Sequence, residues 1–458
     1  MSEVHELKFE RKAPAVLRDK PIDWTLIYPI PTEDSPVTLT PLSVMYPGAL
    51  LESQGMRVEY LDMRWDSWDM MEQLIRDSKN VGVSTFTGKQ CARAAEILER
   101  VKQIDRRIVT HVGGHHARLC PEDVAAEPNV DVVWKEKSYG EDLFPWSKGA
   151  QRLWKRGEIQ YITSTGCPYG CTFCALRSAW TPRPLEKIEQ EITAIQELTG
   201  FTELSLTDPN MGFDRTRVNG VNQKVDRVER LTAIGKIFRD RGIRYDCNLR
   251  ADYITPEVVD AMAGGGCFSV EFGAESGNDE FLQKQIRKGH GTQAVLDANK
   301  YMHGSGISVM NSFVKGMPRE THEQWLDTMQ HIDNIMAIAP EARASVYKFT
   351  PYPGGPAYDL ACAGVGIEKF TPPKRMAEWG NMPLMVDNTY WCTGMCFRLD
   401  NTRKNFPDKD WALIEPYVHL ARKLWKERRP EEFPGEDVDK LVQFQVRKHN
   451  AQLTQAAA

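Results

Sequence analysis

The sequence predicts an α/β protein with an N-terminal doubly wound parallel sheet, a partial (β/α)6 barrel and a C-terminal helical region. Short apolar strands alternate with helices of about a dozen residues from residue 23 to about residue 145. A second series of about six strand–helix repeats begins at residue 158. The pattern changes near Pro372, after which Trp, Met and Pro become frequent. We therefore expect domains at residues 1–150, 151–360 and 361–458.

The first series predicts a parallel sheet because each strand is followed by a helix long enough to cross over it. The predicted helices lie at 40–56, 67–79 and 89–105. The predicted strands are DWTLIYPIP (23–31), RVEYLDM (57–63), NVGVSTFTG (80–88), RRIVTHVGG (106–114) and VDVVWKEK (130–137). Ligands of such sheets bind outside the carboxyl ends of the strands. The residues that follow these strands are therefore candidate binding residues.

The second series predicts the partial barrel, with helices that include 184–200 and 225–242. Its strands begin at EIQYITSTG (158–166) and continue with TELSLTDPN (202–210), IRYDCNLRAD (243–252), CFSVEFGAES (267–276), ISVMNSFVKGMP (307–318) and RASVYKFTPYPG (343–354). The loops at the carboxyl ends of barrel strands carry the active site in this kind of fold.

Composition excludes several classes of protein. The net charge of −5 argues against a general nucleic-acid-binding surface. No run of residues is apolar enough to span a membrane, and the charged N-terminus is unlike a secretory signal. We expect a cytoplasmic protein, in which the ten cysteines do not form a disulfide framework.

Three cysteines stand close together in GCPYGCTFCA (166–175): Cys167, Cys171 and Cys174. A structural zinc site usually has four ligands, and no fourth Cys or His lies nearby in the sequence. A [4Fe–4S] cluster held by only three thiolates would keep one iron open for another ligand. Buried structural cysteines are the alternative. The position after the first barrel strand favours the cluster.

The trio resembles the signature of the radical S-adenosylmethionine (SAM) superfamily, Cx3CxΦC, with Phe173 at the aromatic position. The resemblance implies a [4Fe–4S] cluster whose open iron chelates SAM. It further implies reductive cleavage of SAM to a 5′-deoxyadenosyl radical that abstracts hydrogen from a substrate. A protein reductant of the flavodoxin or ferredoxin type, or a dedicated reductase, is implied as a partner.

Downstream stretches resemble further motifs of that family. FGAESGND resembles its GxESG strand and implies that Glu275 and Ser276 contact SAM. VKGMPRET resembles GxPxET, with Gly316, Pro318, Glu320 and Thr321, and the preceding Lys315 is a candidate cofactor contact. FTPYPGGPAY resembles the PxPGT loop, with Gly355 replacing Thr. The candidate catalytic residues are Asp208 and Arg250, which stand at strand ends with Asn210, and Glu271, which like Asp208 is a candidate acid or base for a leaving hydroxyl group. A lone Arg or Asp at such a place is otherwise a structural ion-pair partner.

The N-terminal sheet resembles the vitamin B12-binding domain found in one branch of that superfamily, and the two resemblances together cover about residues 20 to 360. LLESQGMRVEYLDM, VGVSTFTG, VTHVGGHHA and KEKSYGE match its strand-end loops in order. The resemblance makes a set of residues candidates for holding the nucleotide tail of cobalamin: Ser84, Thr85, Thr87, Gly113 and Gly114. Helix capping and a tight turn explain the same residues without a ligand. If cobalamin binds, His115 and His116 would shape its pocket.

The DxHxxG motif that supplies a cobalt-ligating His in related B12 domains is absent. The corresponding stretch is Asp62-Met63-Arg64-Trp65-Asp66-Ser67, with no His and no following Gly. Cobalamin would therefore bind with its lower face against Arg64 or Trp65, or the domain would serve only as a scaffold.

The C-terminal region offers further candidates. Cys392 and Cys396 are ordinary thiols or ligands of an auxiliary cluster, for which two thiolates are too few without a partner such as Cys362. Trp379, Trp391 and Met385 are candidates for covering the substrate, or plain core residues.

These resemblances imply a radical SAM enzyme acting on a small natural product, foremost by cobalamin-dependent C-methylation. The alternative is cobalamin-independent radical dehydration, cyclisation or epimerisation of a sugar-like or aminoglycoside-like substrate, for instance in antibiotic biosynthesis. A non-catalytic iron–sulfur protein that passes electrons is a third interpretation, which the complete set of SAM-contact motifs disfavours. We expect a small-molecule substrate and neither a nucleic-acid nor a membrane partner.

Overall fold

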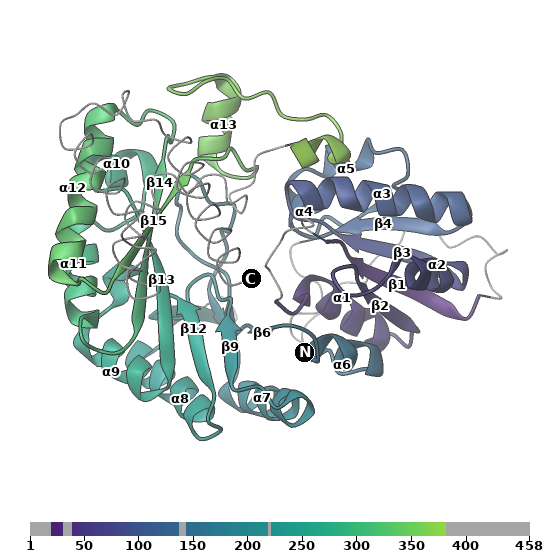
Figure 1. Cartoon of the computed structure of the whole chain (residues 1–458), viewed down its shortest axis with the longest axis horizontal. Helices are drawn as coiled ribbons and strands as arrows, with labels where there is room; N and C mark the ends of the chain where they lie inside the picture. The colour runs from purple at the N-terminus through teal and green to yellow at the C-terminus, as the bar shows by residue number, and fades with distance from the viewer. Residues whose placement is uncertain (1–19, 31–38, 137–142, 219–220, 382–458) are drawn as a thin grey trace, which may run out of the picture. The chain divides into compact units, whose positions relative to one another are not determined.

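The computed structural model describes residues 20–30, 39–136, 143–218 and 221–381 of the 458-residue chain. The chain divides into two compact units, each built around a parallel sheet. Of the described residues, the first unit contains those within 20–160, 197–199 and 372–381, and the second contains those within 161–196 and 200–371. Figure 1 shows the strands and helices of both units.

The first unit has a five-stranded parallel sheet with the strand order β2-β1-β3-β4-β5. The chain goes from β1 to β2 on one side and then crosses to β3 on the other side, which is the doubly wound arrangement. The fold prediction for this region is confirmed. The strands are β1 (Ile22–Tyr28), β2 (Val58–Asp62), β3 (Ser78–Ser84), β4 (Val109–Gly113) and β5 (Val132–Val133).

The helices of the first unit cover this sheet with apolar faces. In α3, for example, Cys91, Ala94, Leu98 and Val101 are buried at helical spacing. Ser67 caps α2 by accepting a hydrogen bond from the backbone of Met70, which ends the preceding loop. The helices are α1 (Leu42–Ser53), α2 (Trp68–Arg76), α3 (Lys89–Ile104), α4 (His115–Leu119), α5 (Pro121–Ala125) and α6 (Lys148–Trp154).

A late segment of the chain also belongs to the first unit. We call its described part, residues 372–381, the return segment; it contains the 3₁₀-helix η4 (Met376–Asn381). Met376 and Trp379 are completely buried. A Cβ added to Gly380 would lie 2.5 Å from the Cβ of Ala92 on α3, so the segment packs very closely on that helix. Trp379, a candidate for covering the substrate, is thus a core residue of the first unit.

The second unit has a six-stranded sheet with the order β15-β14-β13-β12-β9-β6. The strands follow one another in sequence order, and the neighbouring pairs from β9 to β15 are parallel, as expected for a partial barrel. The strands are β6 (Ile159–Tyr161), β9 (Glu203–Leu206), β12 (Arg244–Asn248), β13 (Cys267–Glu275), β14 (Ser308–Lys315) and β15 (Arg343–Lys348).

Helices line the outer face of this curved sheet, as Figure 1 shows for α8, α9, α11 and α12. A capping box at Thr321 and Gln324 begins α12, directly after the Gly-Met-Pro turn that follows β14. The longer helices are α7 (Leu185–Thr199), α8 (Arg227–Arg239), α9 (Pro256–Gly264), α11 (Thr292–Met302), α12 (His322–Ile338) and α13 (Pro356–Ala363).

Some elements were not expected from the sequence. Strands β10 (Arg215–Val218) and β11 (Val221–Lys224) form an antiparallel pair. The Asn-Gly sequence between them is a strong hairpin signal, but it was not used in the prediction. A π-helical turn, η3 (Leu282–Ile286), follows the short α10 (Asp279–Phe281). Most of the predicted C-terminal helical region, from residue 382 onward, lies outside the described residues.

Candidate active site

The cysteine loop follows β6 and β7 (Ser164–Thr165) in the second unit, and backbone bonds hold its middle in place. Thr172 donates from its backbone to Ile286 at 2.9 Å and from its hydroxyl to Gln285 at 2.8 Å. Its carbonyl accepts a bond from the backbone of Ala357, also at 2.9 Å. The loop therefore lies between the π-helical turn and the start of α13, and its thiols project from a fixed backbone.

Two glycines allow this backbone to approach its neighbours. Gly166 has φ +82°, and a Cβ there would lie 2.1 Å from the carbonyl oxygen of Ala179. At Gly355, a Cβ would lie 2.5 Å from the carbonyl oxygen of Thr172. Gly355 replaces the Thr of the family motif, and the close approach explains why a side chain is not tolerated here.

Phe173, the aromatic residue of the cysteine motif, contributes packing. It lies against a buried cluster that includes Phe281, Leu282, Ile286 and Phe349. The side chain thus anchors the loop in the apolar core beneath it, between the second and third cysteines. The predicted cofactor contact of Phe173 stays a prediction.

Cys167, Cys171 and Cys174 are partly exposed, and no disulfide involves them. Burial raises the pKa of the Cys171 and Cys174 thiols, while the positive charge of Lys288 lowers both. Three thiols of one short loop, accessible and beside a cation, form a donor set that fits an iron–sulfur cluster with three protein ligands.

Glu275 and Lys288 form a buried ion pair beside this loop, with 2.7 Å between the carboxylate Oε1 and Nζ. Glu275 adopts φ +63° at an irregularity in the pairing of β13 with β14. A Cβ on Gly273 would lie 2.0 Å from that Oε1, so the carboxylate folds back over the glycine. The GAES sequence therefore requires its Gly to seat the Glu. Lys288 was not predicted.

Arg250 is buried and reaches the cysteine loop through Tyr169. Its guanidinium carbon lies 3.5 Å from the centroid of the Tyr169 ring, and Nε donates to Asp252 at 2.9 Å. The hydroxyl groups of Tyr169 and Tyr253 are hydrogen-bonded at 2.5 Å. Arg250 thus positions the loop between the first two cysteines, a role that sequence reasoning missed because Tyr169 was not considered.

Asp208 is completely buried and accepts hydrogen bonds from the backbone and hydroxyl of Thr163 and from the hydroxyl of Ser164. Burial raises the pKa of this carboxyl group. These bonds fix the strand end that leads into the cysteine loop. The nearby Asn210 side chain is buried, and neither of its polar atoms has a hydrogen-bond partner among the described residues. The predicted catalytic role of Asp208 stays a prediction.

Two other predicted residues of this unit belong to β13 or to the turn after it: Glu271 lies in the middle of the strand, and Ser276 directly follows it. Glu271 is exposed and accepts a hydrogen bond from Ser312. Ser276 is buried against Thr328, with 3.3 Å between the hydroxyl oxygens, and accepts from the backbone of Asn278. Ser276 therefore has a structural role in the turn after β13, and its contact with SAM stays a prediction.

Lys315, at the end of β14, lies with Nζ 4.9 Å from the ring centroid of Trp325, and burial lowers its pKa. Burial raises the pKa of the neighbouring Glu320 to about 7. One Glu320 oxygen accepts from the backbone of Gly316, and the other has no hydrogen-bond partner in the described part of the chain.

In the first unit, the hydroxyl groups after β3 are engaged within the protein. Ser84 donates to Ser43 at 2.9 Å, and Thr85 donates to the carbonyl of Gly113 at 2.8 Å. Gly114 has φ +93°, and a Cβ there would lie 2.5 Å from the carbonyl oxygen of Thr85. The turns therefore explain Thr85, Gly113 and Gly114 structurally, and their contact with a nucleotide tail stays a prediction.

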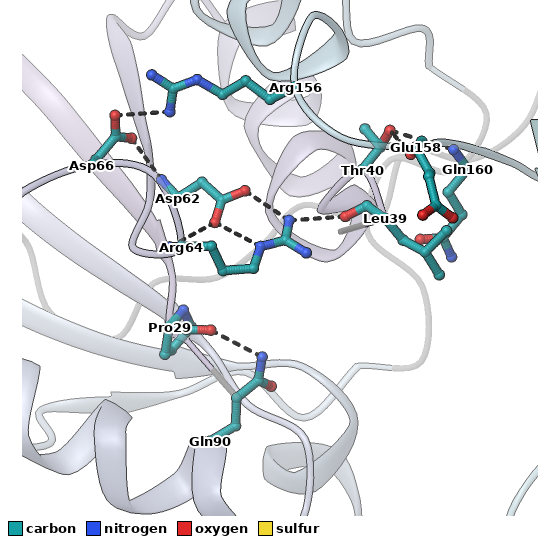
Figure 2. A network of polar contacts seen from close by, with 10 residues as sticks. All are labelled: Pro29, Leu39, Thr40, Asp62, Arg64, Asp66, Gln90, Arg156, Glu158 and Gln160. Atoms are coloured by element: carbon teal, nitrogen blue, oxygen red, sulfur yellow. Dashed lines mark hydrogen bonds and ion pairs between the residues drawn. The ribbon is translucent and has the colours of Figure 1, made fainter. Parts of the chain in front are cut away.

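Arg64 occupies the place after β2 where related domains carry a His, and Figure 2 shows how it is held. Nε and Nη2 donate to the Asp62 carboxylate at 2.8 and 2.7 Å, and Nη2 also donates to the Leu39 carbonyl at 2.8 Å. The guanidinium carbon lies 4.5 Å from the ring centroid of Tyr28. Arg64 is therefore a neutralised and nearly buried cation, whereas Trp65 is half exposed.

The loop around Arg64 is fixed by a second carboxylate, Asp66. It accepts the backbone N–H of Asp62 at 2.9 Å and one bond each from Arg152 and Arg156 at 2.8 Å. This end of β2 offers no imidazole. The loop would therefore offer a corrinoid no imidazole ligand, and the exposed side chain of Trp65 would be available to contact the macrocycle.

Cys392 and Cys396 lie outside the described residues, as do Trp391 and Met385. Cys362 is a partly exposed free thiol. None of the described helices is both long and apolar enough to cross a membrane.

Comparison with known proteins finds a family match in each of the two units. The B12-binding domain family matches residues 31–144, and the radical SAM superfamily matches residues 161–332. An uncharacterised methyltransferase of Pyrococcus horikoshii is 26% identical over 245 residues, which cover 51% of this chain and 48% of the relative. The cytidylyl-2-hydroxyethylphosphonate methyltransferase of Streptomyces wedmorensis is 20% identical over 388 residues, covering 62% of this chain and 70% of the relative. The chain thus spans about half the length of the first of these relatives.

Two solved structures share the fold. The cobalamin-dependent SAM radical enzyme OxsB, with aqua-cobalamin and SAM bound, has a TM-score of 0.66 at 16% identity, over 94% of this chain and 75% of OxsB. The radical SAM methyltransferase TsrM of Kitasatospora setae, with cobalamin and a [4Fe–4S] cluster, has a TM-score of 0.56 at 18% identity, over 78% and 80%. These two structures show the same fold, and the two family matches identify the chain as a radical SAM protein with a B12-binding domain N-terminal to the radical SAM domain.

Proposed function

We propose that the protein is a cobalamin-dependent radical SAM methyltransferase that methylates carbon in a small natural product. The observation that carries the proposal is the combination of the three-cysteine loop in one unit with a doubly wound B12-type sheet in the other. When bound, the cluster supplies the electron that cleaves SAM, and the corrinoid supplies the methyl group.

The residues of the second unit would hold the cluster and SAM. Cys167, Cys171 and Cys174 provide three thiolates, which leave one coordination position for SAM. Glu275 provides a buried carboxylate that can accept hydrogen bonds from an amino or hydroxyl group. Lys288 pairs with this carboxylate and holds it in one orientation.

The residues of the first unit would hold the corrinoid by its face. Arg64 and Asp62 form an ion pair that has no net charge, and this pair is fixed before any ligand binds. Trp65 provides exposed aromatic surface. A small substrate is supported by the net charge of −5, which disfavours RNA, and by the phosphonate methyltransferase among the relatives. A protein reductant must supply the electron.

Radical dehydration, cyclisation or epimerisation without cobalamin is the second candidate. It is favoured by the absence of an imidazole after β2 and by the internal hydrogen bonds of Ser84, Thr85 and Thr87. In this case the first unit is a scaffold.

Anaerobic spectroscopy separates the two. The full-length protein is reconstituted with iron and sulfide, incubated with and without hydroxocobalamin, and freed of unbound ligand. Methylation requires a stable corrinoid absorbance at about one equivalent per chain, and Arg64→Ala should reduce its retention. A reconstituted protein that cleaves SAM but retains no corrinoid would refute the methyltransferase and support the second candidate.

A further inference from the structure

A second group of metal-ligating side chains lies in the first unit, where α4 meets α5. His116, Cys120 and Asp123 each offer one ligand atom, and these atoms all lie within 4.8 Å of one another. The spacing arises from helical periodicity, because the backbone N–H of Cys120 bonds to the carbonyl of His116 at 2.8 Å and Asp123 follows in the first turn of α5. The cluster shares no residue with the cysteine loop.

His116 has the features of an oriented ligand. The side chain is completely buried, and its Nδ1 is hydrogen-bonded to the hydroxyl of Thr87 at 3.0 Å. Nε2 makes no hydrogen bond to the described residues and lies 3.9 Å from Oδ2 of Asp123. A buried imidazole nitrogen without a partner is costly in an ordinary core, whereas a metal ion would satisfy it.

The return segment completes the surroundings of the cluster. Trp379 donates from Nε1 to Oδ2 of Asp123 at 2.6 Å, and its ring lies edge-on to His116 with 5.1 Å between the centroids. This hydrogen bond orients the carboxylate in the way that outer partners orient metal ligands. Cys120 is buried and Asp123 is partly exposed, so the ion would enter from the Asp123 side.

We propose that His116, Cys120 and Asp123 bind a zinc ion through Nε2, Sγ and a carboxylate oxygen, with a water molecule as the fourth ligand. Zinc accepts nitrogen, sulfur and oxygen together, at about 2.0 to 2.3 Å. In a tetrahedral site these bond lengths place the ligand atoms about 3.4 to 3.7 Å apart, so the side chains need to close by about 1 Å. On binding, the Cys120 thiol releases its proton to solvent, and no oxidation or reduction occurs.

The test is zinc loading of the full-length protein with its iron–sulfur cluster already assembled. Equilibrium dialysis against zinc with a competing chelator, followed by metal analysis, should find about one zinc per chain in addition to iron. Zinc X-ray absorption should show one sulfur at about 2.3 Å and nitrogen or oxygen at about 2.0 to 2.2 Å.

Variants distinguish this site from adventitious binding. Cys120→Ser and Asp123→Asn should lose the tight site, and Thr87→Val should weaken zinc binding about 10- to 100-fold. Asp123→Asn keeps a carbonyl oxygen for Trp379, and circular dichroism checks that it folds. His115→Gln and Cys362→Ser, which change a neighbouring imidazole and a distant thiol, should bind zinc like the wild type.

Hydrogen exchange provides a separate readout, because zinc should slow exchange in residues 115–125 and in η4. The proposal is overturned if the cluster-loaded wild type binds no zinc, if the bound zinc has no sulfur ligand, or if the folded Cys120→Ser variant binds zinc with wild-type affinity. It does not depend on the methyltransferase assignment, since it is measured without substrate or SAM.

Discussion

Replacing Glu275 by Ala should have two separable effects, on stability and on SAM binding. The side chains of Glu275 and Lys288 are 7% and 9% exposed and in contact at 2.7 Å, so solvent screens the pair little. Removing one member of a buried pair leaves the other charge uncompensated, which costs about 3–5 kcal/mol. This is a large part of the roughly 5–15 kcal/mol of stability that a protein usually has.

A double-mutant cycle measures this pairing. Glu275→Ala and Lys288→Met should each destabilise the anaerobic, cluster-loaded protein toward denaturant, and the double variant should be much less destabilised than the sum. Glu275→Gly serves as the matched control for the backbone. Glycine adopts the left-handed conformation of this position without strain, so the free energy of unfolding of Glu275→Gly should be about 1 kcal/mol higher than that of Glu275→Ala. Additive effects of the two single changes would refute the pairing.

The second effect concerns SAM. Calorimetry on cluster-loaded Glu275→Ala, at a temperature where the variant is folded, should show weaker SAM binding because the buried acceptor is gone. The visible absorbance of the cluster should be unchanged, since the three thiols remain. SAM affinity equal to that of the wild type would contradict the proposed role of Glu275.

Three further outcomes are expected. Replacing Cys167, Cys171 or Cys174 by Ala should abolish both the cluster absorbance and the formation of 5′-deoxyadenosine, and continued formation in the triple variant would refute the cluster assignment. With cobalamin bound and reduced to Co(II), the electron paramagnetic resonance spectrum should lack nitrogen superhyperfine splitting because Arg64 replaces the ligand His; observed splitting would identify a nitrogen ligand. The pKa of Glu320 is raised from 4.5 to about 7, so the unfolded state ionises first and stability falls as pH rises between these values. Glu320→Gln should remove about 2 to 3 kcal/mol of this fall, as measured by denaturation at pH 4.5 and 7.5; an unchanged slope would contradict it.

The sequence was sufficient for features that depend on local pattern. Alternating apolar strands and helices predicted both sheets, because hydrophobic periodicity and crossover length determine a parallel arrangement. The spacing of Cys167, Cys171 and Cys174 predicted one loop after the first strand of the second unit, and the structure has that loop there.

Features that depend on tertiary contacts could not be predicted. Lys288 faces Glu275 only because a shift in strand pairing and a π-helical turn bring the two together. Ser84 and Thr85 are predicted ligand contacts, and their hydrogen-bond partners within the protein, Ser43 on α1 and Gly113 at the end of β4, are distant in the sequence. No local sequence pattern indicates which hydroxyl groups will form hydrogen bonds with residues that are distant in the sequence.

The return segment has a consequence for how the protein is made. The ribosome completes the five strands of the first unit early, but Met376 and Trp379, which are buried in that unit, are synthesised only after the whole second sheet. Until then the face of α3 that receives Gly380 is open on the nascent chain. The packing of the first unit therefore cannot be completed until residues 372–381 have been synthesised, although domains usually fold in order of synthesis. A chain released before residue 372 would expose this apolar face, so translation that stops early yields an unfinished N-terminal unit that chaperones and proteases can recognise.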